Sequence, residues 1–415
     1  MDAMKSPAFF PRHLSAELVR ALSETPVVCL LGPRQSGKTT LVRTLSRAYV
    51  SLDDENLLRT AKQDPAGFVG ALPDPVTIDE VQLAPALLRA IKVSVDNDRR
   101  AGRFLLTGSA NLLLLPKLSE SLAGRMEVLH LQPFCEAEKE RQPGGFLGAF
   151  LRGEIAPAIV GGDEVPIAGI AARMVAGGYP EPFGRTPAGA ARWHRNYLTS
   201  IIARDISQIA RVRDAREVSR LLELLSHRTA ALLNVSNLGG DLGHDRKTVE
   251  HYLAILERLF LLRTLPAWHR SGANRLIKAS KTHLIDTGLA ATLAGLREQD
   301  WNLRRDRFGC LLESFVLQQL VAQAGWTDPD LRFWHYRDKD QVEVDVVITR
   351  GEETWGVEVK ASATTASSDA RGLRRFAELA GQRFRGGALF YSGSSTLPTS
   401  DPRILAIPLS RLWDM

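Results

Sequence analysis

Short apolar runs alternate with helical segments in the first third of the chain. The run Val27–Leu31 is continuously apolar, as buried parallel strands are, and leads directly into a glycine-rich segment and a helix that begins near Gly37. Further strands are expected at 49–52, 76–78, 104–107 and 128–131, with a helix at 86–97. Because strands that alternate with helices pair in parallel, this pattern predicts a doubly wound α/β domain.

The pattern changes twice beyond this domain. A Gly- and Pro-rich stretch at 143–162 predicts a linker or excursion, and helical sequence then extends from 188 to about 260. Short β-rich runs return at 333–336, 342–348, 354–359 and 387–391, which predicts a second α/β region. We therefore divide the chain into a core at 1–135, a linker and helical excursion at 136–200, a helical region at 201–295 and a C-terminal α/β domain at 296–415.

Composition sets broad limits on this organisation. A length of 415 residues favours two to four domains, and a formal net charge of +6 permits a nucleic-acid partner without requiring one. The cysteines Cys29, Cys135 and Cys310 lie far apart, which argues against a disulfide framework and a zinc site. Because the sequence lacks an uncharged apolar stretch of ~18 residues, we expect a cytoplasmic protein with no membrane partner.

The segment GPRQSGKT, from Gly32 to Thr39, has the pattern of a phosphate-binding loop. Its glycines let backbone N–H groups surround phosphate oxygens, Lys38 would bring a positive charge to the β- and γ-phosphates, and Thr39 would ligate Mg²⁺. The strand before it and the helix after it argue against a chance glycine-rich turn. The residues predicted to bind the nucleotide are Gly32, Pro33, Arg34, Gln35, Ser36, Gly37, Lys38, Thr39 and Thr40.

Acidic and polar residues end the next two strands. Asp79 would hold Mg²⁺ directly or through water, and Glu80 would polarise the attacking water, although a solvated strand end is the simpler alternative. Ser109 or Asn111 could orient water or the γ-phosphate, or could cap a helix. Arg125 is a candidate arginine finger for a neighbouring subunit, a candidate sensor in its own subunit, or a surface arginine. The predicted catalytic residues are therefore Lys38, Glu80, Ser109, Asn111 and Arg125.

These motifs carry a family resemblance. GPRQSGKTTL, TIDEVQ, LLTGSAN and LAGRMEVLHLQPF, in this order, resemble the prokaryotic AAA-type ATPases that pair an ATPase core with a C-terminal domain of uncharacterised function. The segments GGYPE at 177–181, RDI at 204–206 and LIDTGL at 284–289 extend the resemblance over nearly the whole chain. The resemblance implies a five-stranded P-loop core of AAA type, ATP and Mg²⁺ as ligands, and assembly into a homo-oligomer. It implies no substrate.

The helical region contains a helix-turn-helix pattern. Apolar residues recur at helical spacing in a helix that opens at Asp245, and the segment 235–244 before it reads as a short helix and turn. The strand-like run 261–265 could begin a wing. In such a winged-helix-like module the second helix would offer Arg246, Lys247, Thr248 and His251 to DNA. Packing against the nucleotide domain or against another protein is the alternative.

The C-terminal domain carries a second set of acids. Asp345 lies on one expected strand, and Glu358 and Lys360 share one face of the next. This arrangement resembles the PD-(D/E)xK nuclease core, in which two carboxylates hold Mg²⁺ and the lysine activates or orients water. Glu313, on an apolar helix, would supply a further acid and metal ligand. The alternatives are a chance Glu-x-Lys on a solvated strand face and a nuclease-like fold used only for binding.

The leading hypothesis is a Mg²⁺-dependent ATPase whose AAA-type core drives conformational change in the winged-helix-like and nuclease-like regions, acting on or near DNA. The alternative is a nucleotide-switched binding or signalling module whose nuclease-like domain is catalytically silent. A third hypothesis makes the chain a metal-dependent nuclease that ATP controls.

Overall fold

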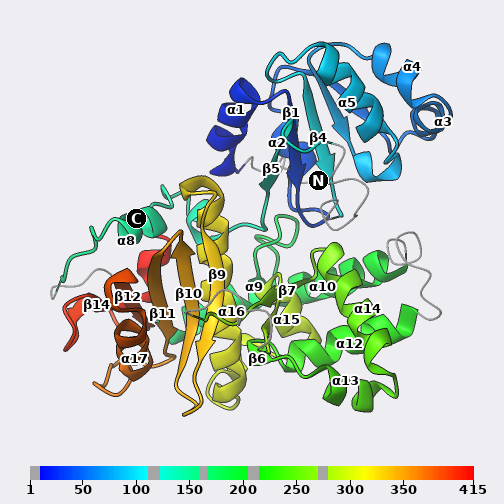
Figure 1. Cartoon of the computed structure of the whole chain (residues 1–415). Helices are drawn as coiled ribbons and strands as arrows, with labels where there is room; N and C mark the ends of the chain where they lie inside the picture. The colour runs from blue at the N-terminus through cyan, green and yellow to red at the C-terminus, as the bar shows by residue number, and fades with distance from the viewer. Residues whose placement is uncertain (1–9, 111–121, 159–165, 204–214, 270–278) are drawn as a thin grey trace, which may run out of the picture. The chain divides into compact units, whose positions relative to one another are not determined.

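The computed structural model describes residues 10–110, 122–158, 166–203, 215–269 and 279–415 (Figure 1). The chain forms two compact units, Met1–Gly144 and Gly145–Met415. Asn111 and the RDI segment at 204–206 lie outside the described residues, so their predicted roles stay predictions.

A parallel sheet of five strands forms the centre of the first unit, as the apolar runs predict. Its strands are β1 (Val27–Leu31), β2 (Ala48–Ser51), β3 (Val76–Asp79), β4 (Phe104–Gly108) and β5 (Met126–His130). They are arranged in the order β2-β3-β4-β1-β5, and every neighbouring pair is parallel. Since the carboxyl ends of parallel strands meet at one edge, the polar residues that follow β1, β3 and β4 are brought together.

Helices connect and cover these strands. They are α1 (Leu14–Glu24), α2 (Lys38–Val42), α3 (Glu55–Gln63), α4 (Pro65–Gly70), α5 (Leu87–Asn97) and α7 (Glu136–Lys139), with a 3₁₀ turn η1 (Val81–Leu83). Leu14 and Leu18 of α1 share a buried apolar cluster with Val28 and Leu30 of β1. This packing fixes the strand that leads into the glycine-rich loop.

The second unit begins with a mainly helical region. Its elements are α8 (Phe146–Leu151), α9 (Ile167–Ala176), α10 (Pro187–Ile201), α12 (Ala215–His227), β6 (Ala231–Leu232), α13 (Val235–Leu242), α14 (Arg246–Arg258), β7 (Leu262–Leu265), β8 (Lys281–Leu284) and α15 (Thr287–Leu293). The three strands form an antiparallel sheet with β8 in the middle. The stretch expected as a linker contains α8, whose Phe146 ring lies 5.4 Å from that of Phe390.

The motifs GGYPE and LIDTGL meet in this region. Asp286 is fully buried, and its carboxylate accepts hydrogen bonds from the backbone N–H groups of Gly178 and Leu289. Gly177 has φ +70°, and a Cβ atom there would overlap the carboxylate of Asp286. The two motifs therefore form one buried joint between the α9–α10 turn and the start of α15.

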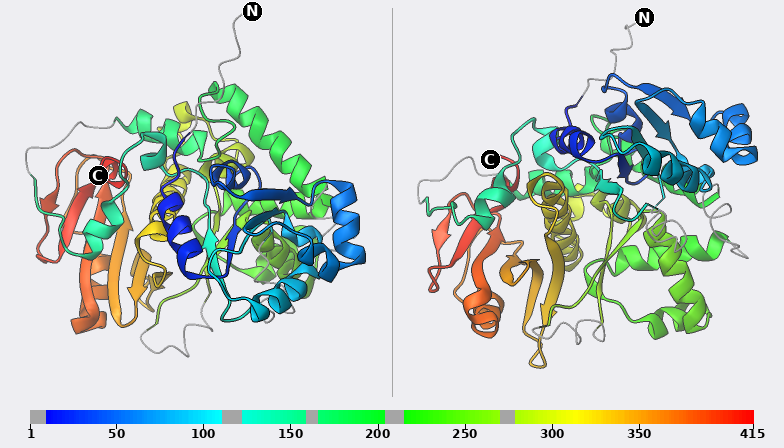
Figure 2. Two further views of the ribbon diagram at one scale, coloured as in Figure 1. Left: turned by 90° about the horizontal axis from the view of Figure 1, so that it is seen from above. Right: turned by 45° about the horizontal axis from the view of Figure 1, so that its top comes forward.

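A mixed six-stranded sheet ends the second unit, as the β-rich runs predict (Figure 2). Its elements are η5 (Glu298–Asp300), α16 (Arg305–Thr327), β9 (Arg332–Arg337), β10 (Glu343–Arg350), β11 (Glu353–Val359), α17 (Arg371–Ala380), η6 (Gly381–Arg383), β12 (Phe384–Tyr391), β13 (Leu397–Pro398), β14 (Ile404–Pro408) and η7 (Leu409–Leu412). The order is β13-β14-β12-β11-β10-β9, with β9, β10 and β11 antiparallel and β11, β12 and β14 parallel. Leu373 and Phe376 of α17 join its core.

Candidate functional site

The glycine-rich loop connects β1 to α2 and turns sharply at two glycines. The backbone at Gly32 approaches the carbonyl group of Leu131 so closely that a Cβ atom would overlap its oxygen. Gly37, the residue before α2, has φ +95°, a conformation that glycine adopts without steric cost. Close approach and a left-handed turn thus explain both glycines of the motif, and Lys38 becomes the first residue of the helix.

Lys38 is buried, and its ammonium group finds hydrogen-bond acceptors within its own loop. Its ammonium donates hydrogen bonds to the carbonyl oxygens of Gly32 and Pro33, each at 2.8 Å. Burial lowers the pKa of Lys38 to about 8, although the carboxylates of Glu80 and Asp79 oppose this shift. A phosphate oxygen is a stronger acceptor for this ammonium than a neutral carbonyl.

Asp79, at the end of β3, is the acceptor for three hydroxyl groups. The Oγ1 atom of Thr39 lies 3.1 Å from the Oδ2 atom of Asp79, so the loop and the acidic strand end meet as predicted. The hydroxyl groups of Tyr49 and Thr107 also donate to this carboxylate. Sequence reasoning missed Tyr49 and Thr107, because their proximity depends on the strand order on either side of β3.

Glu80 and Ser109 are brought together as well. Glu80 has φ +58°, and its Oε2 atom accepts a hydrogen bond of 2.9 Å from the Oγ atom of Ser109. The amide of Gln82, which sequence reasoning missed, donates both to Glu80 and to Ser109. These three side chains form a closed triangle at the ends of β3 and β4.

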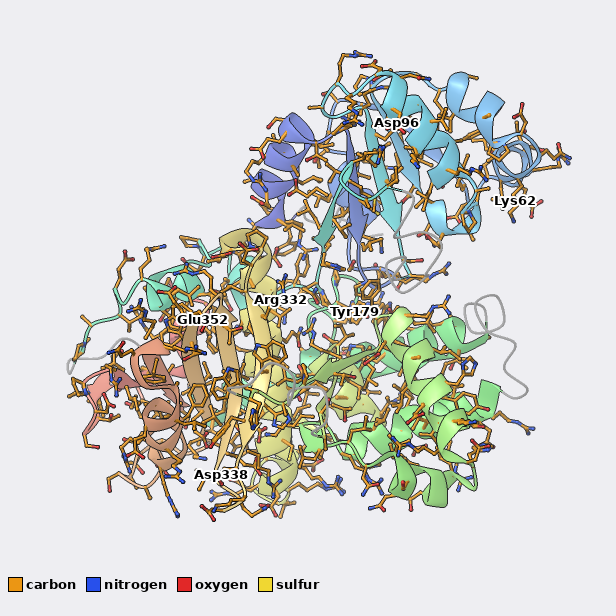
Figure 3. The ribbon with its side chains drawn as sticks, viewed as in Figure 1. Lys62, Asp96, Tyr179, Arg332, Asp338 and Glu352 are labelled. Carbon is orange, nitrogen blue, oxygen red and sulfur yellow. The ribbon has the colours of Figure 1, made fainter. Side chains whose placement is uncertain are left out.

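Arg125 lies at the other end of the sheet. It directly precedes β5, whose first residue pairs with Val27 at the start of β1, whereas the phosphate loop follows the end of β1. Its guanidinium donates to Asp96 of α5, labelled in Figure 3, at 2.6 Å. This placement does not fit a sensor of the nucleotide in its own chain, because a five-residue strand separates the two. A role as a finger toward a neighbouring subunit stays a prediction.

Arg12, before α1, is a further residue that sequence reasoning missed. It is buried, and its guanidinium donates to the carbonyl oxygen of Ser36 at 2.7 Å and to the carboxylate of Glu138 at 2.8 Å. Glu138 also accepts from the backbone N–H groups of His13 and Cys135. The phosphate loop is therefore tied through one buried ion pair to α7.

Comparison with known families agrees with this geometry. Residues 24–139 match the family described as AAA domain. The N-terminal unit contains an AAA domain. Nucleotide binding is therefore assigned to it, with the loop at 32–39 inside the matched segment. Residues 168–300 and 308–412 match two families described as domains of unknown function, DUF8612 and DUF4143.

Two mycobacterial proteins are similar to this chain over most of its length. The chain is 29% identical over 404 residues to uncharacterized protein Mb2031c of Mycobacterium bovis and to uncharacterized protein Rv2008c of Mycobacterium tuberculosis, covering 97% of this chain and 84% of each relative. Among solved structures, protein VC1899 from Vibrio cholerae aligns over 94% of this chain and 95% of its own length, with 11% identity and a TM-score of 0.22. That score supports no structural argument.

Outside the AAA domain, the C-terminal acids lie on adjacent strands as predicted. Val346 pairs with Val357, which places Asp345 and Glu358 at the next position of β10 and β11. The N–H group of Val359 donates to the Oδ2 atom of Asp345 at 2.9 Å. Lys360 lies on the same face as Glu358 and donates to its Oε1 atom at 2.7 Å.

Glu313, on α16, joins these acids through a lysine that sequence reasoning missed. The Nζ atom of Lys281 lies 3.1 Å from Glu313, 3.5 Å from Glu343 and 3.5 Å from Asp345. Burial, and next the charge of Asp345, raise the pKa of Glu313 to about 8. Burial alone would lower the pKa of Lys281, but the carboxylates of Glu313, Asp345 and Glu343 outweigh it and raise this pKa.

In the ranges that the structure describes, three or more His, Cys, Asp and Glu side chains do not gather in an arrangement that could hold a metal ion. The predicted metal ligands Glu313, Asp345 and Glu358 thus lie near one another without forming such a group. Within the same ranges, no helix is both long enough and apolar enough to cross a membrane.

Proposed function

We propose that the AAA domain hydrolyses ATP with Mg²⁺. One observation carries this proposal: the Oγ1 atom of Thr39 lies 3.1 Å from the carboxylate of Asp79, beside the buried ammonium of Lys38. A hydroxyl and a carboxylate are the oxygen donors that Mg²⁺ takes, so Thr39 and Asp79 would hold the ion. When bound, Mg²⁺ would offset charge on the β- and γ-phosphate oxygens.

The protein's own groups would perform the remaining tasks. The backbone N–H groups of the loop and the amino end of α2 would orient the phosphates, with Arg34, Gln35 and Ser36 in the loop and Thr40 in α2. Lys38 would exchange its two carbonyl acceptors for phosphate oxygens. Glu80 would accept a hydrogen bond from the attacking water at its carboxylate, whose Oε2 atom accepts from Ser109 and Gln82. Ser109 thereby positions the carboxylate.

The test measures ATP affinity and phosphate release by the purified full chain. Lys38→Ala should lose ATP binding, because the loop then lacks its charge for the phosphates. Lys62→Ala is the matched control, since Lys62 is an exposed lysine of α3 in the same unit (Figure 3). Unchanged ATP affinity and hydrolysis in Lys38→Ala would overturn the proposal.

A second proposed function is contact with DNA through α14, in a winged-helix-like module. Arg246, Lys247 and His251 are exposed on this helix, whereas Val249 and Leu253 are buried. The helix follows α13 and a turn, and β7 and β8 form the antiparallel pair that a wing requires. This face would contact phosphates or a major groove.

The DNA proposal is tested by salt-dependent binding of unrelated duplexes. Lys247→Ala should weaken binding to all sequences about equally and reduce the salt slope by about 1, as expected for one lost phosphate contact. Lys62→Ala serves again as the control. If wild type binds no duplex, or if Lys247→Ala leaves both quantities unchanged, the exposed face of α14 does not contact DNA.

For the C-terminal domain we propose a binding role without cleavage, which keeps the nuclease-like residues Glu313, Asp345, Glu358 and Lys360 catalytically silent. The contacts of Lys281 and Lys360 with the acids support this choice. Plasmid and single-stranded DNA are incubated with Mg²⁺ or Mn²⁺, with and without ATP. Wild type and Asp345→Ala should leave the same products, whereas cutting by wild type alone would establish a nuclease.

A further inference from the structure

The C-terminal acids surround an ammonium group of the chain itself. Lys281 is 3% exposed, and its Nζ atom lies within 3.5 Å of one oxygen from each of Glu313, Glu343 and Asp345. These acids come from α16 and β10, whereas the lysine comes from β8. A single positive charge thus occupies the position at which carboxylates from two elements converge.

Backbone pairing on both sides fixes the position of this lysine. β8 is the middle strand of its sheet, and Lys281 is paired with Leu232 of β6 and with Leu265 of β7. The same region is joined to β9, because His335 donates its N–H to Pro266 at 2.9 Å and accepts at its carbonyl from Trp268 at 2.6 Å. Lys281 is therefore held as firmly as a core residue and is not free to swing out as a surface lysine is.

The remaining charges of the cluster are also partly neutralised. Lys360 contacts Glu358 at 2.7 Å, and Arg337 contacts Glu343 at 2.8 Å. The Oε2 atom of Glu358 is buried and has no hydrogen-bond partner among the described residues. Four carboxylates thus face three cationic side chains, and the Oε2 atom of Glu358 is open to a further ligand.

An ammonium and a divalent cation cannot share these oxygens. Like charges a few ångströms apart repel strongly, and more so where a low-dielectric interior replaces water. A cation between Glu313 and Asp345 would also have to displace a lysine that its strand neighbours hold in place. The geometry therefore sets Lys281 and a metal ion in direct competition.

We propose that Lys281 is the resident cation of this cluster, that it takes the place of a divalent ion between Glu313 and Asp345, and that removing its charge creates a divalent-cation site. This inference deepens the silent role proposed for the C-terminal domain and is independent of ATP hydrolysis. As the structure describes them, the carboxylates of Glu313, Asp345 and Glu358 do not form a group that could hold a metal ion. They would have to move inward once the ammonium is removed, and their oxygens would then be the ligands of the created site.

The test counts Mn²⁺ ions bound to the full chain without nucleotide, by electron paramagnetic resonance titration. Lys281→Met keeps the apolar stem and removes the charge, so it should bind one Mn²⁺ more than wild type. Adding Asp345→Asn to this variant should abolish the extra ion, and Lys281→Arg, which keeps a cation, should show none. The AAA domain is unchanged in all four proteins, so any Mn²⁺ that it binds cancels in the comparison.

Two outcomes would overturn the proposal. One is a folded Lys281→Met protein that binds no more Mn²⁺ than wild type. The other is a wild-type protein that already binds an ion which Asp345→Asn removes. The second comparison requires only wild type and Asp345→Asn, so it can overturn the proposal even if Lys281→Met fails to fold. Failure of ATP hydrolysis in a separate assay would leave both comparisons intact.

Discussion

The ammonium of Lys38 donates a hydrogen bond to the carbonyl oxygen of Gly32 at 2.8 Å, inside the loop that is expected to hold phosphate. Burial lowers the pKa of Lys38 to about 8 from 10.5. The phosphates of ATP favour the charged form of Lys38. At a pH where this lysine is partly neutral, ATP binding should therefore be accompanied by uptake of a proton. We predict that ATP affinity falls as the pH rises above about 8, toward tenfold per pH unit. Calorimetry in buffers of different ionisation enthalpy measures both effects.

Lys38→Arg is the control for this pH dependence, because a guanidinium stays charged over the same range. The fall in ATP affinity with pH should be absent from Lys38→Arg. An equal fall in this variant would show that a group other than Lys38 loses the proton.

The pH dependence of stability gives a second measurement of the same pKa. The unfolded chain binds more protons at this lysine between about pH 8 and 10.5, so the free energy of unfolding contributed by Lys38 rises with pH in that window.

A second prediction concerns Glu80. Glu80→Gln should lower the rate of ATP hydrolysis by about 10²- to 10⁴-fold, the contribution of a positioned general base, while ATP affinity stays close to that of wild type. Ser109→Ala should lower the rate less, because Gln82 still holds the carboxylate. Phosphate release and nucleotide binding are measured on the same preparations. A Glu80→Gln protein that hydrolyses ATP at the wild-type rate would remove Glu80 from the mechanism.

The strands and the phosphate loop could be predicted because their signals are local. Buried strands such as β1 and β4 are continuous apolar runs, and the ends of β10 and β11 agree with their predicted bounds within two residues. Thr39 lies against Asp79, and Glu80 against Ser109, because these residues follow strands whose carboxyl ends meet at one edge of the sheet. Their roles in binding the nucleotide and in hydrolysis stay predictions.

The missed residues depend on distant contacts. Arg12 meets Glu138 across 126 positions, and Lys281 meets Asp345 across 64. A single lysine in the run Lys281–Leu284 carries no pattern that separates it from an exposed one, and only the pairing of β8 with both neighbours buries it. The glycines and prolines at 143–162 predicted a linker or excursion, and this signal does not place the helix α8 that lies within the stretch.

A third prediction concerns the ion pair of Arg12 with Glu138. Arg12→Met should lower the free energy of unfolding by about 3–5 kcal/mol, because the fully buried carboxylate of Glu138 then lacks its counter-charge. Arg20→Met is the control: Arg20 pairs with Glu17 on an exposed helix face, and its loss should cost much less, because solvent screens this ion pair. Urea unfolding measures both. The double variant of Arg12 and Glu138 to Met should recover part of the loss, and equal losses in the two arginine variants would show that burial adds nothing.

The last prediction tests the joint between Gly177 and Asp286. Gly177→Ala and Gly184→Ala both place alanine at positive φ, +70° and +79°, which strains the backbone in each case. Gly177 also has ψ −171°, a combination that essentially only glycine adopts. A Cβ atom at Gly184 meets no heavy atom within 4 Å among the described residues beyond its chain neighbours, whereas one at Gly177 overlaps the carboxylate of Asp286. Displacing that carboxylate breaks its bonds to Gly178 and Leu289, at about 1–3 kcal/mol for each buried group left unpaired. Gly177→Ala should therefore lower the thermal midpoint of unfolding clearly more than Gly184→Ala. Equal midpoints would mean that the carboxylate of Asp286 can move away from a Cβ atom at position 177 without loss of stability. The contact would then not require glycine at this position.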